Sequence, residues 1–179
     1  MLKPAVVCFF VMTTISFAKD EPGPPKELAS LRTWVGIWDA EIEVWPQGLD
    51  KPSIKFEGVE TNRAYDKYWI ASDFDSTFNG QLTRVHSIVG YDLDQRKLVG
   101  KVIDDGPYAA SMVGDYDEES RTVTWRTDVK DADGKPIVQR TTVTELNDNE
   151  RLLVLSVPTQ SKNVFKKFMQ IRFNRRKAQ

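Results

Sequence analysis

The pattern of hydrophobic and polar positions changes at Gly36. Before this glycine, four apolar residues recur at helical spacing: Leu28, Leu31, Trp34 and Val35. This spacing predicts a short helical turn over residues 26–35. After the glycine, apolar and polar residues alternate from Trp38 to Val44, which predicts a half-buried β-strand. A large indole at the start of the first strand suits a small barrel whose preceding turn folds across one end.

Ten alternating or apolar runs, separated by turn residues, fill the rest of the chain. They cover residues 36–45, 53–65, 69–78, 81–91, 97–103, 108–116, 121–130, 135–146, 150–157 and 163–174. Between the third and fourth runs, Asn79-Gly80 is a strong hairpin signal, because both central positions of a type I′ turn need a positive φ. Consecutive strands at this regular spacing predict an all-β fold, an antiparallel up-and-down barrel of about ten strands with a short N-terminal helix.

The first 18 residues have the pattern of a secretory signal peptide. Lys3 supplies a positive charge, residues 5–15 are apolar, and Ser16-Phe17-Ala18 is a small-x-small cleavage site. We therefore expect cleavage near Ala18 and export to the periplasm or the medium. Residues 19–25, rich in charge, proline and glycine, are expected to form a flexible leader, and residues 26–179 to form one barrel domain.

Composition excludes several classes of function. Cys8 is the only cysteine and lies within the predicted signal, so the mature chain has no disulfide. Without Lys3, 24 Lys and Arg remain against 26 Asp and Glu, which argues against a nucleic-acid partner. No second hydrophobic segment approaches membrane length, so we expect no membrane span in the mature protein. The sequence does not indicate an oligomeric state.

The short motifs resemble those of a known family. Gly36-x-Trp38 after a helical turn is similar to the lipocalin signature, in which the tryptophan closes the barrel floor and an arginine of the final strand stacks on it. The resemblance implies that Arg172 or Arg175 has this role. The order LRTWVGIW, GYD at Gly90 and GDYD at Gly114 also resembles a bacterial family catalogued as domain of unknown function 1579. Its members are exported and lipocalin-like, and the resemblance implies no established activity.

Candidate catalytic and metal-binding groups are few. His86 is the only histidine, so a zinc or copper site is not favoured, and the sequence predicts no cofactor. Ser87 follows His86 directly and so faces the other side of its strand, which disfavours a Ser-His-Asp triad. Asp73 and Asp75 share one face of a strand and are candidates for a carboxylate pair with one raised pKa. The acidic turns at residues 92–94, 115–117 and 131–134 lack the further ligands of a calcium loop.

A basic C-terminal segment contains no acidic residue between its positive charges. It comprises Lys162, Lys166, Lys167, Arg172, Arg175, Arg176 and Lys177. Such a segment is typical of a solvated strand face, and it also suits an anionic surface or ligand.

Aromatic residues are spread through the predicted strands, and several strands are mixed on both faces. A barrel interior with some polar side chains suits an enclosed cavity, and a cavity lined by aromatic residues with a few polar groups is typical of a small-molecule site. The residues predicted to contact a small hydrophobic or amphipathic ligand are Trp69, His86, Trp125, Arg126 and Arg140. The pattern does not determine which strand faces point inward.

Three hypotheses remain open at this point. The first is an exported barrel that binds a small hydrophobic or amphipathic molecule in its cavity. The second is an isomerase or hydrolase that acts on a lipid-like substrate in the same cavity, with His86, Asp73 or Asp75 as the base. The third is a structural or interaction domain with a filled barrel.

Overall fold

The computed structural model describes residues 25–107, 109–130, 134–159 and 164–177. These ranges contain one helix and ten strands: α1 (Lys26–Arg32), β1 (Gly36–Val44), β2 (Ile54–Tyr65), β3 (Trp69–Phe78), β4 (Gln81–Asp92), β5 (Lys97–Asp104), β6 (Ala109–Asp117), β7 (Thr122–Lys130), β8 (Pro136–Asn147), β9 (Glu150–Pro158) and β10 (Phe165–Arg175). All ten predicted strands are confirmed, with ends within two residues of the expected positions. The predicted signal peptide and nearly all of the predicted leader lie outside the described residues.

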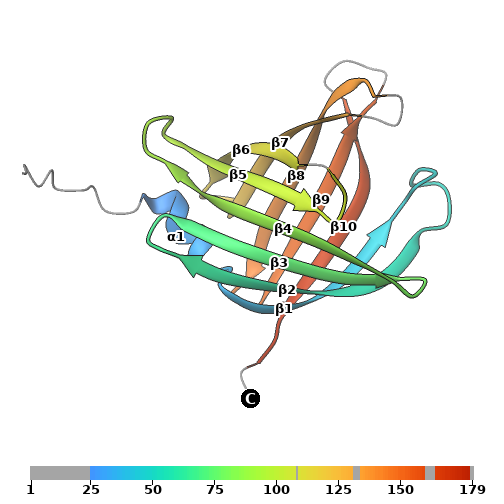
Figure 1. Ribbon diagram of the computed structural model, residues 1–179, viewed down its shortest axis with the longest axis horizontal. Helices are drawn as coiled ribbons and strands as arrows, with labels where there is room; N and C mark the ends of the chain where they lie inside the picture. Colours follow the sequence, from blue (N-terminus) through green and yellow to red (C-terminus); the bar gives the residue numbers. More distant parts are fainter. Residues whose placement is uncertain (1–24, 108, 131–133, 160–163, 178–179) are drawn as a thin grey trace, which may run out of the picture.

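The ten strands form a closed antiparallel barrel (Figure 1). Each strand pairs with the next one along the chain, and β1 pairs with β10 to close the ring. Trp38 on β1 lies opposite Arg175 on β10 and opposite Glu60 on β2. The predicted up-and-down barrel is therefore confirmed, and closure gives every described strand two hydrogen-bonded neighbours.

The hairpin between β3 and β4 has the predicted backbone. Asn79 has φ 51° and Gly80 has φ 78°, so both central residues lie in the left-handed region that a type I′ turn requires. A Cβ atom at Gly80 would meet no atom within 4 Å. Glycine is therefore favoured here by the backbone conformation and not by lack of space.

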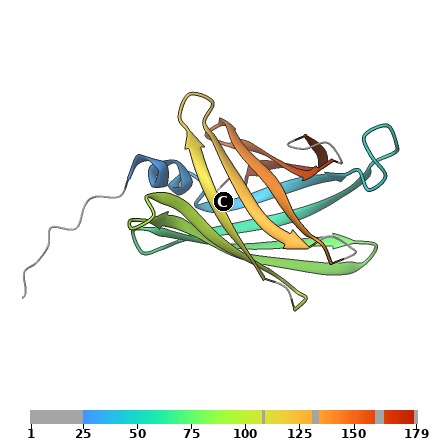
Figure 2. The same cartoon turned by 90° about the horizontal axis from the view of Figure 1, so that it is seen from above.

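Helix α1 closes one end of the barrel. It lies at the end opposite the Asn79–Gly80 hairpin and the β1–β2 connection (Figures 1 and 2). Leu28 and Leu31 of the helix are fully buried and pack with Trp34 against strand residues that include Val89 and Trp125. A second cluster, built around Trp38, Ala40, Ile42, Ile171 and Phe173, lies between β1 and β10. We call the part of the barrel that these two clusters fill the closed half.

The rest of the inner face is more accessible. We call it the open half, and six inward-facing residues define it here: Val85, Ser87, Val102, Met112, Thr141 and Leu155. They lie on the inner face because the strand registers give them the same alternation as core residues such as Val89, Leu98 and Trp125. All six are half-buried, although they point into the barrel. Solvent therefore reaches the inner face of the open half.

No helix within the described ranges is long and apolar enough to cross a membrane.

Candidate functional site

The closed half ends at a tryptophan covered by an arginine. Gly36 has φ 134°, which favours glycine, and a Cβ atom there would lie 2.8 Å from Nη1 of Arg175. The guanidinium Cζ of Arg175 lies 4.1 Å from the ring centroid of Trp38. Arg175 also donates hydrogen bonds to the carbonyl oxygens of Val35 (2.8 Å) and Thr33, which tie the last strand to the chain just before β1.

A second arginine lies deeper in the barrel. Arg151 on β9 is 3% exposed, and its Cζ lies 4.3 to 5.0 Å from the ring centroids of Trp34, Trp38 and Phe173. Its Nη2 forms an ion pair with Oε2 of Glu60, while neither Nε nor Nη2 has a partner in hydrogen-bond geometry in the described part of the chain. Burial, and to a smaller extent the charge of Arg175, lowers the pKa of Arg151 to about 9. Arg151 therefore remains charged at neutral pH.

Glu145 on β8 joins helix α1 to the barrel wall. Its Oε1 accepts hydrogen bonds from the hydroxyls of Ser30 (2.8 Å) and Thr33 (2.9 Å) and from the indole nitrogen of Trp34 (3.1 Å). Its Oε2 accepts two more from Arg121, at 2.8 and 3.2 Å. The Glu145 side chain is 6% exposed, so one buried carboxylate accepts hydrogen bonds both from the segment of helix α1 and from the barrel wall.

The five residues predicted to contact a ligand do not lie together. Trp125 is the only one that faces the interior, and it is 3% exposed within the closed-half core. A Cβ atom at Gly114 would lie 2.6 Å from Cε3 of Trp125, so the indole packs flat over this glycine on the neighbouring strand. The role of Trp125 in the described structure is to fill the core.

Trp69 faces the outside of the barrel. It alternates with the core residue Ile70, and its ring covers Gly90 on β4 as the ring of Trp125 covers Gly114 inside. With Ile88 and Val99 it lines a shallow surface depression of about 250 Å³. Trp69 is therefore separated from the interior by the thickness of the sheet.

His86 also lies on the outer face, beside the carboxylate pair considered above. Its Nδ1 is 2.8 Å from Oδ1 of Asp73, and Arg63 pairs with the other oxygen of this carboxylate. These two partners, His86 first and then Arg63, lower the pKa of Asp73. Asp75 pairs with Arg84. The proposed bases of the enzyme hypothesis therefore lie outside the barrel, in ion pairs, and the expectation of a raised pKa is wrong for Asp73.

Arg126 and Arg140 lie opposite each other on the outer faces of β7 and β8. Both are exposed, and Cζ of Arg140 lies 4.4 Å from the ring centroid of Phe165. Arg172, the alternative candidate for stacking on Trp38, instead pairs with Glu150 on the outer surface. Of the predicted residues, Gly36, Trp38 and Arg175 come together at the barrel floor.

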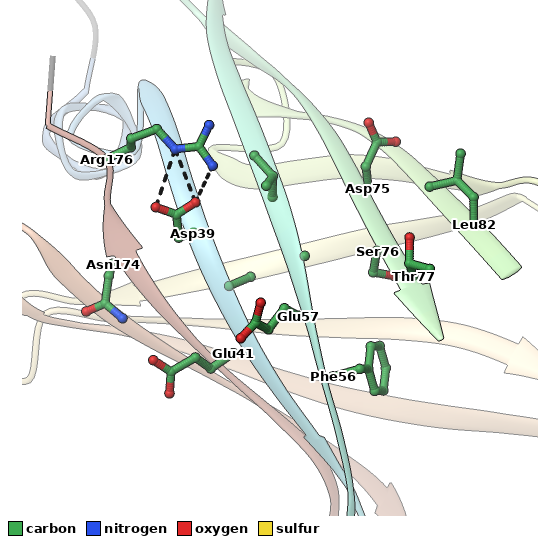
Figure 3. A pocket seen from close by; sticks show the side chains of 13 residues that line it. Asp39, Glu41, Phe56, Glu57, Asp75, Ser76, Thr77, Leu82, Asn174 and Arg176 are labelled. Carbon is green, nitrogen blue, oxygen red and sulfur yellow. Dashed lines mark hydrogen bonds and ion pairs between the residues drawn. The ribbon is translucent and has the colours of Figure 1, made fainter. Parts of the chain in front are cut away.

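A surface depression of about 890 Å³ is on the outer face of β10, β1, β2 and β3 (Figure 3). At its centre Glu41 and Glu57 lie opposite each other on adjacent strands, and neither has an ion pair or hydrogen bond within the described residues. Arg176 pairs with Asp39 at one end of this outer groove. The outer groove is open to solvent and lies on the other side of the sheet from the open half.

The basic C-terminal segment is mostly engaged by neighbours. Arg175 and Arg172 have the partners described above, Arg176 pairs with Asp39, and Lys167 lies over the ring of Trp45, 4.3 Å from its centroid. Lys162 lies outside the described residues. In the part of the chain that the structure describes, no group of three or more His, Cys, Asp or Glu side chains is placed to hold a metal ion. The described acidic turns at residues 92–94 and 115–117 use their carboxylates on backbone amides, as for Asp92 and Asp117.

The family of the chain follows from its sequence. The family model described as "Protein of unknown function (DUF1579)" matches residues 23–175, which include the whole barrel. The chain belongs to the DUF1579 family. Curated protein sequences give no match to this member of the family.

The solved structure of a phycobiliprotein lyase has the same architecture as this DUF1579 barrel. The S-type phycobiliprotein lyase CpeS from Guillardia theta superposes with a TM-score of 0.55, at 10% sequence identity, over 83% of this chain and 91% of the lyase chain. A redesigned β-barrel matches with a TM-score of 0.43 at 7% identity, over 83% of this chain and 96% of that chain. At 10% identity the likeness to the lyase shows a shared lipocalin-like barrel fold and nothing more.

Three charged side chains of the inner face of this DUF1579 barrel were not predicted from the sequence: the half-buried Glu60 and the buried Glu145 and Arg151. One signal was available for Arg151, which has the same parity as Leu153 and Leu155 along β9 and so shares their inward face. Glu145 likewise has the parity of Val143, a core residue. Charged residues on an apolar face are easily assigned to the outside because burial of an unpaired charge is costly.

Proposed function

We propose that this DUF1579 protein binds a small hydrophobic or amphipathic molecule in the open half of its barrel. One observation carries the proposal: the apolar side chains that point into the barrel stay half-buried in the open half, whereas the core residues of the closed half are buried. Apolar groups inside a protein normally pack to exclude solvent. Inward apolar residues such as Val102, Met112 and Leu155 that remain accessible are typical of a ligand site open at one end.

The closed half supports this proposal by limiting access to one end. Helix α1 and the arginine over Trp38 fill the floor with buried side chains, and Glu145 links the helix to the wall. A ligand then enters from the end that carries the β3–β4 hairpin. Binding against a rigid floor favours affinity, because the wall does not have to be ordered at the time of binding.

The likeness to a phycobiliprotein lyase is consistent with this reading at the level of architecture. A barrel of this shape is also the fold of a protein named as a phycobiliprotein lyase. The enzyme hypothesis has no comparable support in the interior, since His86, Asp73 and Asp75 are on the outer face.

Export is part of the proposal and rests on the N-terminal sequence pattern. Lys3, the apolar residues 5–15 and the Ser16-Phe17-Ala18 triplet have the order of a cleavable signal. Cell fractionation combined with N-terminal sequencing tests it. We expect a mature protein that begins at Lys19 in the exported fraction, and a full-length chain in the cytoplasm contradicts export.

A matched pair of variants on β6 tests binding in the interior. Ala110 faces inward and is half-buried, whereas its neighbour Ala109 faces outward and is exposed. The probe is N-phenyl-1-naphthylamine, a neutral apolar molecule whose fluorescence rises in an apolar environment. We expect wild-type protein and Ala109→Phe to bind the probe alike, and Ala110→Phe to bind it at least about tenfold more weakly, because the added ring occupies the space of the probe.

Three results would contradict the proposal. These are no binding of the probe by the wild-type protein, equal binding by both variants, and a loss in Ala109→Phe alone. Urea unfolding of both variants separates loss of the site from loss of the fold, since a folded Ala110→Phe variant unfolds in a single cooperative transition like the wild type.

A further inference from the structure

We infer that the ligand of the open half is a neutral, largely apolar molecule that carries hydroxyl or carbonyl groups at two separated points. The inference rests on the proposed function, and it adds the chemical class of the ligand. It follows from three features of the inner face: polar side chains without partners, an apolar stretch of wall between them, and charges that lie only at the closed end or at the open rim.

Several polar side chains of the inner face have no hydrogen-bond partner among the described residues. Four of them are Ser87 on β4, Thr127 on β7, and Gln139 and Thr141 on β8, while Ser76 on β3 lies nearer the β3–β4 hairpin. Thr127 is only 6% exposed, and its hydroxyl oxygen makes no bond to the described protein but remains accessible to solvent. A ligand that covers this hydroxyl has to provide it with a partner, because nearly all buried polar groups in folded proteins are hydrogen-bonded. These side chains therefore offer donors and acceptors that a bound molecule can use.

The four side chains lie at two separated points of the wall. Thr127 and Gln139 face each other directly across the β7–β8 pair, and Thr141 is the next inward residue of β8. Ser87 is on β4, three strands away in the barrel order. At the usual spacing between neighbouring strands this separation is about 14 Å along the sheet. A molecule that satisfies both points must span this part of the wall.

The wall between these points is apolar. On β5 and β6 the inward residues at this level are Val102, Gly100, Ala110 and Met112. None of them offers a side-chain hydrogen bond. The body of the ligand that lies against them is therefore apolar, and its polar groups lie at its two ends.

The charges of the inner face argue against a charged ligand. Glu60 pairs with Arg151, and Glu145 pairs with Arg121, at the closed end. The other charged inward positions in the described strands are Arg175, which lies over Trp38 at the closed end, and Asp104 and Lys166, which are exposed at the open rim. A carboxylate held beside Ser87 or Thr127 would have no cation to pair with, and burial of an unpaired charge is costly. This favours a neutral molecule over a fatty acid.

A series of rigid fluorescent probes tests the class of ligand: stilbene, 4-hydroxystilbene and 4,4′-dihydroxystilbene. Energy transfer from tryptophan to the probe reports binding. We expect the affinity to rise along the series, with the dihydroxy probe at least about tenfold tighter than stilbene, because each added hydroxyl replaces water with a wall side chain. We also expect cis-parinaric acid, a fatty acid, to bind more weakly than the dihydroxy probe.

Two variants remove one hydrogen-bonding point each. Thr127→Val keeps the shape and the strand preference of the side chain, and Ser87→Ala removes the hydroxyl of β4. Either change should reduce the preference for the dihydroxy probe about threefold to tenfold and leave stilbene binding within about twofold. Thr124→Val, on the outer face of the same strand as Thr127, is the matched control and should change neither affinity.

Equal affinity for the three stilbenes overturns this inference and leaves the proposed function intact. So does tighter binding of cis-parinaric acid than of the dihydroxy probe, or an unchanged preference in both Thr127→Val and Ser87→Ala. If none of these probes and no N-phenyl-1-naphthylamine binds, the proposed function itself fails and the inference fails with it.

Discussion

The guanidinium of Arg175 lies over the indole of Trp38, 4.1 Å from the ring centroid to Cζ, at the closure of the barrel between β10 and β1. The same guanidinium donates to the carbonyl oxygens of Val35 and Thr33. One side chain therefore satisfies backbone carbonyls between α1 and β1 and covers the tryptophan of the floor. The contact of Arg175 with Trp38 is a cation–π interaction, whereas its contacts with Val35 and Thr33 are hydrogen bonds.

Replacement of this arginine should destabilise the barrel. For Arg175→Ala we expect a loss of about 2 to 4 kcal/mol in the free energy of unfolding, from the cation–π contact and from carbonyl oxygens left without donors. Arg175→Lys should recover part of this loss, because an ammonium keeps the charge but not the planar fork. Urea unfolding measures the effect. Arg172→Ala is the control, and a larger loss in the control than in Arg175→Ala would contradict the role of Arg175.

The attachment of helix α1 to the barrel depends on one carboxylate. Glu145 accepts from Ser30, Thr33 and Trp34 on the helix side and from Arg121 on the barrel side. Glu145→Ala should cost about 2 to 4 kcal/mol, since it leaves several donors without an acceptor in a buried position. The measurement is the free energy of unfolding, with the near-ultraviolet circular dichroism of the tryptophans as a second readout.

The outcome for Glu145 can be compared with that of an exposed ion pair on the same helix. Lys26 and Glu118 also join α1 to the barrel, but both side chains are 69% exposed. Glu118→Ala should leave the unfolding midpoint unchanged, because exposed ion pairs contribute little. If both substitutions shift the midpoint equally, the helix is not attached through Glu145.

The fold could be predicted from the sequence because the signals that mark each strand and turn are local. Alternation with period two and turn residues such as Asn79 and Gly80 are properties of short segments, so each strand could be read without knowledge of the others. The order of hairpins then left the closed meander as the simplest way to pair every strand. The Gly36-x-Trp38 motif in the same way indicated the floor, because a glycine with positive φ and the indole after it are neighbours in sequence.

The inner face of the open half could not be predicted in this way, because its strands are mixed on both faces. Thr141 points inward and Thr142 points outward, and no local pattern distinguishes these two threonines. Trp69 and Trp125 look equivalent as single residues, yet one covers a glycine outside the barrel and the other covers a glycine inside. Which side chains point into the barrel depends on the register of all ten strands together.

Acid should destabilise the outer face through Asp73. Hydrogen bonds from His86 and Arg63 hold its pKa below the ordinary value of 3.8 in the folded protein, so the unfolded chain binds this proton more tightly. The stabilising contribution is complete above the ordinary pKa and is lost as the pH falls through the lowered one. We expect Asp73→Asn to reduce the difference in urea midpoint between pH 6 and pH 2.5.

A control for this pH dependence is available on the same surface. Asp128 on β7 is exposed and has no ion pair within the described residues. Asp128→Asn should therefore keep the wild-type difference between the two pH values. If Asp73→Asn also keeps it, the ion pairs with Arg63 and His86 do not contribute to acid sensitivity.

The buried pair of Arg151 and Glu60 provides the last prediction. Glu60 is 15% exposed and Arg151 is 3% exposed, so removal of one partner leaves a buried charge uncompensated. Glu60→Ala should cost about 3 to 5 kcal/mol, which is the usual effect of breaking a buried pair. The double variant Glu60→Leu, Arg151→Met replaces both charges by apolar groups. It should be close to the wild type in stability, because the aromatic rings of Trp38 and Phe173 pack against an apolar side chain as well as against a guanidinium.

The comparison of these two variants decides what the pair does. Urea unfolding of Glu60→Leu, Arg151→Met and the double variant forms a cycle from which the coupling can be read. A double variant as unstable as Glu60→Ala would mean that the guanidinium itself is required among the rings. A stable double variant with unchanged binding of N-phenyl-1-naphthylamine would show that the two charges contribute to the closed half alone. A stable double variant with altered binding would show that Glu60 and Arg151 also influence the ligand site in the open half.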